Sequence, residues 1–256
     1  MSSLVENVIL NGVRLHFPPF AVGKPAANPA TLLHYMVLVL KTGMAWRHLA
    51  ETKCPYNYRT VHRTFQNWSR AGVFQTAYRN ILKLYRRKRR PKYHCIDSSY
   101  VKNLYGVDCV GRNPTDRGRK ATKLSAIVDD NGVPIALTLF PANHSDFGTV
   151  ADTLSATLEA PMGGLPISAD KGYDSAKVRS QLSNAGYVER VAKRRHVGHR
   201  ILNRKRGVVE RFFSWLDKHR RLLMRYDSYV CNYASWTWLA CCRLISNRVS
   251  KVSDSF

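Results

Sequence analysis

The 256-residue sequence predicts an α/β fold, in which a mixed sheet with flanking helices follows a small helical module at the N-terminal end. Three observations lead to this prediction. Apolar residues recur at helical spacing from residue 29 to about residue 85, short β-rich runs replace that pattern after Pro91, and strand and helix patterns alternate from residue 146 onward. We therefore expect a helical domain over residues 1–90, ending in a basic linker, and an α/β domain over residues 91–256.

The N-terminal segment combines helical periodicity with basic residues. Apolar side chains three and four positions apart include Leu32, Met36 and Leu40, and later Val61, Phe65 and Trp68. The arginines among them are Arg47, Arg59, Arg63 and Arg70. Short basic helices of this kind indicate a DNA-binding module such as a helix-turn-helix. An ordinary helical bundle with a solvated basic face gives the same pattern, so both interpretations stand at this point.

The elements expected after Pro91 have lengths typical of strands and helices. They are a strand over 93–101, β-rich runs over 123–128 and 133–140, a helix over 146–158, a strand over 166–169, a helix from 174 to about 185, a long helix over 206–221 and a closing helix over about 236–247. Asn131-Gly132 separates the two β-rich runs and favours a two-residue hairpin turn. The mostly basic region 190–206 is expected to form a loop.

The charge balance of the chain points to a polyanionic partner. Lysine and arginine outnumber the acidic residues by 41 to 17, which gives a formal net charge of +24. Such a charge repels itself unless a polyanion covers it, and nucleic acid is the polyanion we expect. An anionic membrane surface or the packing of ribosomal RNA would also satisfy the charge. The 45% hydrophobic content argues against simple RNA packing, because it is enough for a packed core.

Other classes of protein are not predicted. The apolar stretches 32–40 and 236–245 are shorter than the about 20 residues that cross a bilayer, so we expect no membrane insertion. The six cysteines form no C-x-x-C pair and no secretory leader precedes the first apolar block, which predicts a reduced, cytoplasmic location associated with the nucleoid. Zinc-ligand spacing and a G-x-x-x-x-G-K-[ST] motif are both absent from the sequence.

Three carboxylates stand out in this basic sequence: Asp97, Asp170 and Glu210. Asp97 and Asp170 each follow an apolar β-run, and strand ends deliver side chains to one edge of a sheet, where α/β sites usually form. Glu210 falls opposite the apolar stripe of the predicted long helix. Each acid alone has an ordinary structural interpretation, as an edge-strand residue, a turn residue and a helical partner of Arg206. Together they predict a divalent metal site beside a phosphate chain.

Several segments of the chain resemble those of a known family. They are Lys41-Thr42-Gly43-Met44-Ala45-Trp46-Arg47-His48-Leu49, Tyr58-Arg59-Thr60-Val61, residues 68–74, Ile96-Asp97-Ser98, Ala169-Asp170-Lys171-Gly172-Tyr173-Asp174 and Arg206-Gly207-Val208-Val209-Glu210-Arg211. With these segments the chain resembles a DDE transposase of the insertion-sequence-five type, in the IS4/IS5-like superfamily, which has an RNase H-like catalytic core. The resemblance runs through nearly the whole chain, and the last three segments are specific in combination.

The resemblance implies a transposase that binds terminal inverted repeats, cleaves the element ends and transfers their 3′-hydroxyls to target DNA. It implies that Asp97, Asp170 and Glu210 hold two Mg²⁺ ions, for which Mn²⁺ can substitute, with Asp97 bridging both ions. His144 and Asp146 are candidates for a supporting role, and a loop or cap role for His144 is the ordinary alternative. Binding of two double-stranded ends implies a dimer or larger assembly on DNA. The residues expected to contact DNA are Arg47, Arg59, Arg63, Arg70, Arg119, Lys120, Lys123, Lys171, Arg206 and Lys218.

The sequence departs from the family signature of tyrosine, two residues, arginine, three residues, glutamate, six residues and lysine. Arg206 and Glu210 fit it, whereas Asn203 stands at the tyrosine position and Asp217 at the lysine position, with Lys218 beside it. We therefore expect contacts to the transposon-end strand that differ from those of relatives. Two alternatives stay open: a catalytically silent, domesticated DNA-binding relative, and an RNase H-like nuclease that cuts without joining.

Overall fold

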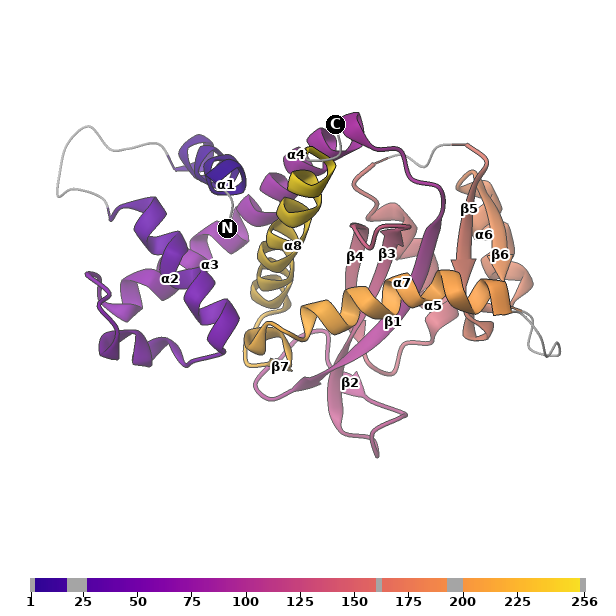
Figure 1. Cartoon of the computed structure of the whole chain (residues 1–256). Helices are drawn as coiled ribbons and strands as arrows, with labels where there is room; N and C mark the ends of the chain where they lie inside the picture. The colour runs from indigo at the N-terminus through magenta and orange to yellow at the C-terminus, as the bar shows by residue number, and fades with distance from the viewer. Residues whose placement is uncertain (1–2, 18–26, 160–162, 193–199, 254–256) are drawn as a thin grey trace. The chain divides into compact units, whose positions relative to one another are not determined.

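The computed structural model describes the backbone of residues 3–17, 27–159, 163–192 and 200–253 (Figure 1). The chain divides into two compact units, one made of Met1–Arg89 with Lys218–Phe256 and the other of Arg90–Asp217. We predicted a single boundary near residue 90 and assigned everything after it to the α/β domain. In the division by packing, the described residues 218–253 fall in the same unit as the N-terminal helices.

The first unit is helical. Its elements are α1 (Ser3–His16), α2 (Pro29–Thr42), the 3-10 turn η1 (Trp46–Glu51), α3 (Tyr58–Arg70), α4 (Val73–Lys88), the 3-10 turn η3 (Arg220–Leu222), the short strand β7 (Met224–Arg225) and α8 (Val230–Ser253). Asn28 caps α2 by accepting hydrogen bonds from the backbone N–H groups of Ala30 (2.9 Å) and Thr31 (3.4 Å). Gly43 ends α2 in the left-handed conformation, with φ at 70°, which glycine adopts without strain.

Aromatic packing joins α8 to the N-terminal helices. α8 lies against α4, and the fully buried Trp236 of α8 stacks on Phe65 of α3 with ring centroids 3.9 Å apart. Beside them Arg221 donates a hydrogen bond to Asp227 at 3.0 Å, with both side chains almost completely buried. A charge so deeply buried needs a partner, and this ion pair supplies one for each. The C-terminal segment therefore completes the core of the first unit.

The second unit contains a mixed sheet. Its strands are β1 (His94–Asn103), β2 (Gly111–Arg112), β3 (Lys120–Asp129), β4 (Pro134–Pro141), β5 (Leu165–Ala169) and β6 (Tyr187–Val191). Their order is β2-β3-β1-β5-β6, with β4 also pairing with β3. β3 runs antiparallel to β1, β2 and β4, whereas β5 runs parallel to both β1 and β6.

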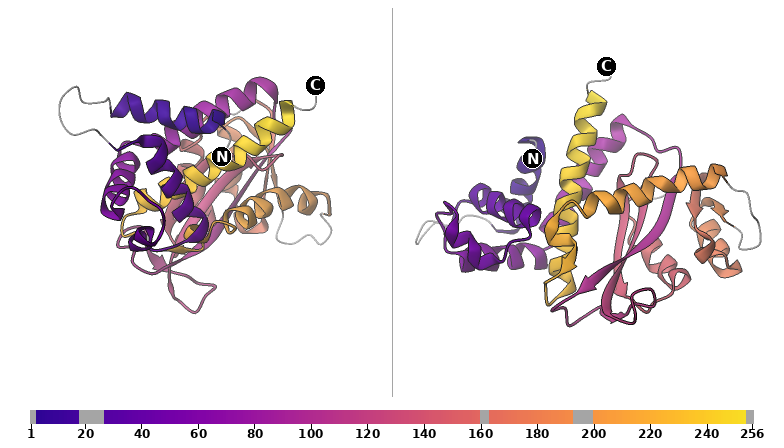
Figure 2. Two further views of the ribbon diagram at one scale, coloured as in Figure 1. Left: turned by 60° about the vertical axis from the view of Figure 1, so that its left-hand side comes forward. Right: turned by 60° about the horizontal axis from the view of Figure 1, so that its bottom comes forward.

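In the described parts of this unit, three α-helices flank the sheet. α5 (Asp146–Ser155) lies against β3 and β4, α6 (Ala176–Asn184) against β6, and α7 (Arg200–Leu216) against β1, β3 and β5 (Figures 1 and 2). The predicted fold class, a mixed sheet with flanking helices preceded by a helical module, is confirmed. None of the helices in the described ranges combines the length and the apolar character needed to cross a bilayer.

Some local expectations were wrong. The turn between β3 and β4 spans residues 130–133 rather than two residues, because the Asp129 carboxylate closes it by accepting from the N–H groups of Asn131 and Val133, both at 2.9 Å. The basic run over 86–90 is largely helical, since α4 continues to Lys88, and lysine and arginine are good helix formers. The predicted loop over 190–206 overlaps the end of β6 at Val191 and the beginning of α7 at Arg200. The long helix that was predicted to reach residue 221 ends at Leu216.

Candidate active site

Strand pairing brings Asp97 and Asp170 together. β1 and β5 run parallel, with His94 opposite Ile167 and Cys95 opposite Ser168. Continuing this register by two residues sets Asp97 beside Asp170, and neighbouring strands lie about 4.8 Å apart. Two aspartates from distant parts of the sequence therefore lie on or just after neighbouring strands. Only Asp170 follows the end of its strand, whereas Asp97 lies inside β1 and pairs with Ala126 of β3, so the predicted strand-end position of Asp97 was wrong.

The peptide that follows each aspartate orients its carboxylate. The Ser98 N–H donates to Asp97 Oδ1 at 2.8 Å. The Lys171 N–H donates to Asp170 Oδ1 at 2.6 Å, where Asp170 caps the 3-10 turn η2 (Lys171–Tyr173). Hydrogen bonds from N–H groups to ionised carboxylates are among the stronger ones in proteins, so they restrict how each carboxylate can turn.

A third carboxylate, that of Asp146, lies close to the same strands. Asp146 is the first residue of α5, and its Oδ1 accepts hydrogen bonds from Ser98 Oγ at 2.7 Å and from Lys123 Nζ at 2.8 Å. Lys123 also donates to the carbonyl oxygen of His144. The other carboxylate oxygen of Asp146 approaches the turn after β5, because a Cβ built on Gly172 would lie 3.3 Å from it. Asp146 thus links β1, β3 and the turn after β5.

Tyr173 is surrounded by these carboxylates. Its side chain is almost completely buried, and its hydroxyl has no hydrogen-bond partner among the described residues. Burial, followed by the charges of Asp97 and Asp146, raises the pKa of Tyr173 well above its ordinary value, and Asp170 adds a smaller effect in the same direction. The nearby Ser98 hydroxyl opposes the rise, although its position does not meet hydrogen-bond geometry. The charges of all three aspartates therefore act on this one buried side chain.

Glu210 lies on the helix that covers the Asp97 face of β1. Side chains alternate along an extended chain, so Tyr93, Cys95 and Asp97 share one face. Burial raises the pKa of Tyr93, and the charge of Arg211 on α7 opposes the rise, which is consistent with the packing of α7 on β1. Glu210 itself is exposed. Within the described residues, no three His, Cys, Asp or Glu side chains are close enough to hold a metal ion, so Glu210 does not complete a three-ligand group with the aspartates.

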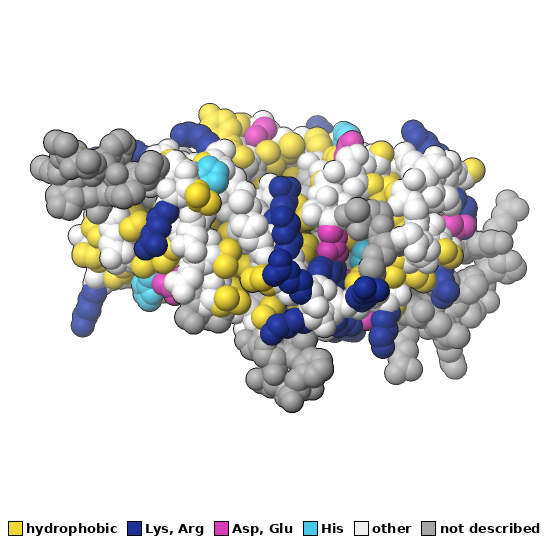
Figure 3. Space-filling model, turned by 90° about the horizontal axis from the view of Figure 1, so that it is seen from above, with side chains coloured by type: hydrophobic (Ala, Val, Ile, Leu, Met, Phe, Trp, Pro, Cys, Tyr) yellow, Lys and Arg dark blue, Asp and Glu magenta, His cyan; other side chains and the backbone are white. Residues whose placement is uncertain are grey.

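The residues predicted to contact DNA are mostly exposed. Those with exposed side chains are Arg47, Arg59, Arg63, Arg70, Arg119, Lys120, Lys171 and Lys218. Figure 3 shows lysine and arginine side chains spread over much of the face in view. Lys123 differs, because only 1% of its side chain is exposed and its ammonium pairs with Asp146. A buried, paired ammonium is not available to a phosphate, so we remove Lys123 from the DNA-contacting set. The side chain of Arg206 lies outside the described residues, as does that of Asn203.

His144 and Asp146 contribute in different ways. The exposed His144 ring stacks on Phe140 with centroids 5.7 Å apart, and only its backbone carbonyl takes part in the network around Asp146. Sequence reasoning missed Ser98 and Tyr173, although both stand within the segments that carry Asp97 and Asp170. It also missed the ion pair between Lys123 and Asp146, because a single lysine in a strand does not indicate which acid it pairs with.

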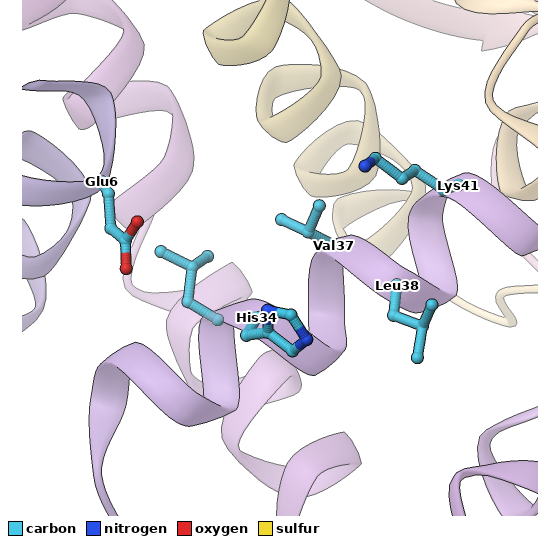
Figure 4. A pocket seen from close by; sticks show the side chains of 6 residues that line it. Glu6, His34, Val37, Leu38 and Lys41 are labelled. Atoms are coloured by element: carbon cyan, nitrogen blue, oxygen red, sulfur yellow. The ribbon is translucent and has the colours of Figure 1, made fainter. Parts of the chain in front are cut away.

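A separate cavity lies in the first unit, between α1 and α2. It has a volume of about 240 Å³ and is lined by Glu6, Leu33, His34, Val37, Leu38 and Lys41. Figure 4 shows Glu6 on one side and the α2 side chains on the other. Half of its lining side chains are apolar and only one carries a carboxylate, so it lacks the oxygen ligands that phosphate chemistry with a divalent metal requires.

Comparison with known proteins gives family matches along most of the chain. Residues 90–245 match the family described as "Transposase DDE domain", and residues 12–78 match the family described as "Putative transposase of IS4/5 family". The chain is similar to a protein of Burkholderia cepacia described as "Putative transposase for insertion sequence element IS402". The identity is 32% over 160 residues, which cover 59% of this chain and 75% of that protein.

Likeness to solved structures is more distant. The Mos1 strand transfer complex matches over 91% of this chain and 81% of that chain, with 14% identity and a TM-score of 0.35. The catalytic domain of the Mos1 mariner transposase matches over 66% of this chain and 91% of that chain, with 15% identity and a TM-score of 0.29. At these scores the likeness carries no argument about function.

Proposed function

Because the chain belongs to the DDE transposases of the IS4/IS5 type, we propose that it cleaves the ends of its own insertion element and joins them to target DNA. The register between β1 and β5, which sets Asp97 beside Asp170, is the observation that carries the catalytic part of this proposal. The proposed catalytic residues are Asp97, Asp170 and Glu210.

The donor set suits a hard divalent cation. Mg²⁺ prefers carboxylate oxygens, and the two adjacent aspartates offer them in orientations that backbone N–H groups restrict. In the proposed site Asp97, Asp170 and Glu210 would hold divalent Mg²⁺ or Mn²⁺. When bound, such ions would supply activation of the attacking water or 3′-hydroxyl and stabilisation of the leaving oxygen. Glu210 has to approach the aspartates for this role, and its helix α7 already packs on the strands that position them.

Basic side chains would hold the DNA around this site. Lys171 is exposed and directly follows Asp170, so it is placed to contact the backbone of the strand being cut. In the first unit the exposed Arg47, Arg59, Arg63 and Arg70 would bind the terminal inverted repeats. Joining two ends in one reaction calls for at least two copies of the chain assembled on DNA.

The experiment that tests the proposal uses the full chain with Mg²⁺, a supercoiled plasmid and labelled duplexes that end in the inverted repeats flanking the gene. We expect nicked ends and joined products from the unaltered protein. Asp97→Asn, Asp170→Asn and Glu210→Gln should abolish both products and leave end binding largely unchanged, because each removes a metal-binding charge with little change of shape.

Asp152→Asn is the matched control, since Asp152 is an exposed aspartate on α5 outside the proposed catalytic set. It should cleave and join as the unaltered protein does. Retained cleavage in any of the three variants would refute the role of that residue. Cleavage without joined products, even from pre-cut ends, would point to a nuclease instead.

A further inference from the structure

The loop between β1 and β2 presents three apolar side chains to solvent. Leu104, Tyr105 and Val107 are 48%, 62% and 72% exposed. β1 ends at Asn103 and β2 begins at Gly111, so the loop lies at the end of the sheet where β3 begins (Figure 1). Large apolar side chains gathered on a surface mark a site of interaction. We call residues 104–107 the β1–β2 tip.

Hydrogen bonds hold the β1–β2 tip in place. Asn103 Oδ1 accepts from the Gly106 N–H at 2.9 Å, and Asn103 Nδ2 donates to the Gly106 carbonyl at 3.1 Å. At the other end of the loop, Thr122 Oγ1 of β3 donates to the Cys109 carbonyl at 2.9 Å. Cys109 has φ at 48°, a conformation that a side-chain-bearing residue keeps only where its surroundings enforce it. The exposure of the tip is therefore built into the loop.

The surroundings of the tip are basic. Between residues 102 and 120 the chain has five basic residues, Lys102, Arg112, Arg117, Arg119 and Lys120, all with exposed side chains. Two acids, Asp108 and Asp116, stand among them, so this segment has a formal net charge of 5 − 2 = +3. Three of these residues lie on strands that pair at one end of the sheet, with Lys102 opposite Ala121 and Arg112 opposite Lys120. Arg117 and Arg119 lie in the loop between β2 and β3, where Arg119 pairs with Asp116. This charge selects a polyanion over an ordinary apolar protein surface.

We propose that the β1–β2 tip binds unpaired DNA bases close to the cleavage site, with Tyr105 stacking on a base and the surrounding cations binding phosphates. Aromatic side chains within a basic surface form stacking platforms for single-stranded nucleic acid, and apolar side chains wedge between unstacked bases. A paired duplex hides its base faces, so the tip would favour opened DNA.

Strand β1 connects the tip to Asp97, one of the proposed catalytic residues. The claim that the tip lies close to the cleavage site therefore rests on the proposed function. β1 runs from Asp97 to Asn103 without a break, and six residues of strand span about 20 Å. A base pair rises about 3.4 Å along DNA, so the tip would reach bases within about six base pairs of the scissile phosphate.

The test measures binding of the full chain to two DNAs without divalent metal. One is a duplex of arbitrary sequence, and the other is the same duplex with a central mismatched bubble that contains 2-aminopurine. The unaltered protein should bind the bubble more tightly and quench the 2-aminopurine fluorescence by stacking. Tyr105→Ala should weaken bubble binding about fivefold or more and remove the quenching, with duplex binding unchanged. Tyr105→Phe keeps the ring and should behave as the unaltered protein.

Tyr229→Ala is the matched control, because Tyr229 is 55% exposed and lies outside the tip. Equal affinity of the unaltered protein for both DNAs, or an equal loss on both with Tyr105→Ala, overturns the proposal. So does a substitution of the tip that leaves DNA binding intact and reduces self-association in sedimentation, since the tip would then be a protein contact. The test involves no cleavage, so a failure of the catalytic proposal and a failure of this one are seen separately.

Discussion

Lys123 and Asp146 form an ion pair whose two ends differ in exposure. Only 1% of the Lys123 side chain is exposed, whereas 36% of the Asp146 side chain is. Removing the carboxylate leaves an ammonium in the interior without a counter-ion, in contact with the His144 carbonyl and the Tyr100 ring. Removing the lysine leaves a carboxylate that water can reach and that still accepts from Ser98. Two substitutions that break the same ion pair should therefore have unequal effects.

We predict that Asp146→Ala lowers the free energy of unfolding by about 3 kcal/mol, because an unpaired buried charge is strongly destabilising. Lys123→Met should cost about 1 kcal/mol, since the charge left behind is partly solvated and the methylenes stay packed. Urea titration followed by circular dichroism measures both. Equal losses, or a larger loss for Lys123→Met, would contradict the assigned roles.

The cysteines should differ sharply in reactivity. Cys231 is exposed, whereas Cys241 and Cys242 are buried in α8. Burial raises the pKa of both buried thiols well above the ordinary value, and the thiolate is the reactive form. We predict that iodoacetamide alkylates Cys231 in the folded protein and reaches Cys241 and Cys242 only after unfolding. Mass spectrometry of the alkylated peptides checks this, and early alkylation of Cys242 would contradict the packing of α8.

Elements with strong local signals were predicted, and those that depend on distant partners were not. The apolar spacing of α2 and α3 and the β-rich run of β3 are visible in the sequence. β6 was missed, because it holds Glu189 and Arg190 and owes its strand conformation to pairing with β5. The break of the predicted long helix at Leu216 was also missed, since the residues after it pack into the other unit.

The same contrast applies to the candidate site. Asp97 and Asp170 were expected at one sheet edge because each follows an apolar run, and the parallel register of β1 and β5, continued by two residues, brings the two positions to neighbouring places. Asp146 was a candidate for a supporting role through the family resemblance, but its partners could not be predicted, because its hydrogen bonds come from Ser98 and Lys123 on two different strands. Glu210 stays a prediction as a metal ligand. Glu210 lies on a helix, as predicted, although that helix spans Arg200–Leu216 instead of 206–221. Whether its side chain reaches the aspartates depends on tertiary packing, which local sequence does not determine.

α3 has the surface expected of an element that binds DNA. Arg59, Arg63 and Arg70 are exposed, while Val61 and Phe65 are buried against the rest of the first unit. We predict that Arg59→Ala and Arg63→Ala each weaken binding to the inverted repeats and reduce the slope of log affinity against log salt by about 1, as expected for loss of one phosphate contact.

Arg14→Ala is the matched control for these two variants. Arg14 is an exposed arginine on α1, so its substitution removes the same charge at a different place on the surface. Titrations of labelled DNA at several salt concentrations measure the slopes. If Arg14→Ala changes the slope as much as Arg59→Ala does, the effect comes from net charge and α3 has no special place in binding.

At the scale of the whole molecule, the first unit is discontinuous in sequence. Its helices come from Met1–Arg89 and from Lys218–Phe256, and the α/β unit is inserted between them. Buried aromatic rings of α8 pack against rings of the N-terminal helices, so the two segments share one core. Trp236 stacks on Phe65, and Trp238 packs against Tyr78 with centroids 5.0 Å apart. The N-terminal helices should therefore not be a domain that folds by itself.

We predict that a fragment of residues 1–89 lacks a cooperative thermal transition, and that joining residues 218–256 to it through a flexible glycine-serine linker restores one. Each large aromatic side chain lost from a core costs about 3–5 kcal/mol. Loss of both tryptophans would thus remove most of the about 5–15 kcal/mol that stabilises a typical domain. Circular dichroism at 222 nm during heating measures the transition in both proteins.

The same fusion with Trp236→Ala and Trp238→Ala is the control, and it should lack a cooperative transition as the short fragment does. A cooperative transition in residues 1–89 alone, at the temperature of the fusion, would mean that α8 covers a core that is already complete.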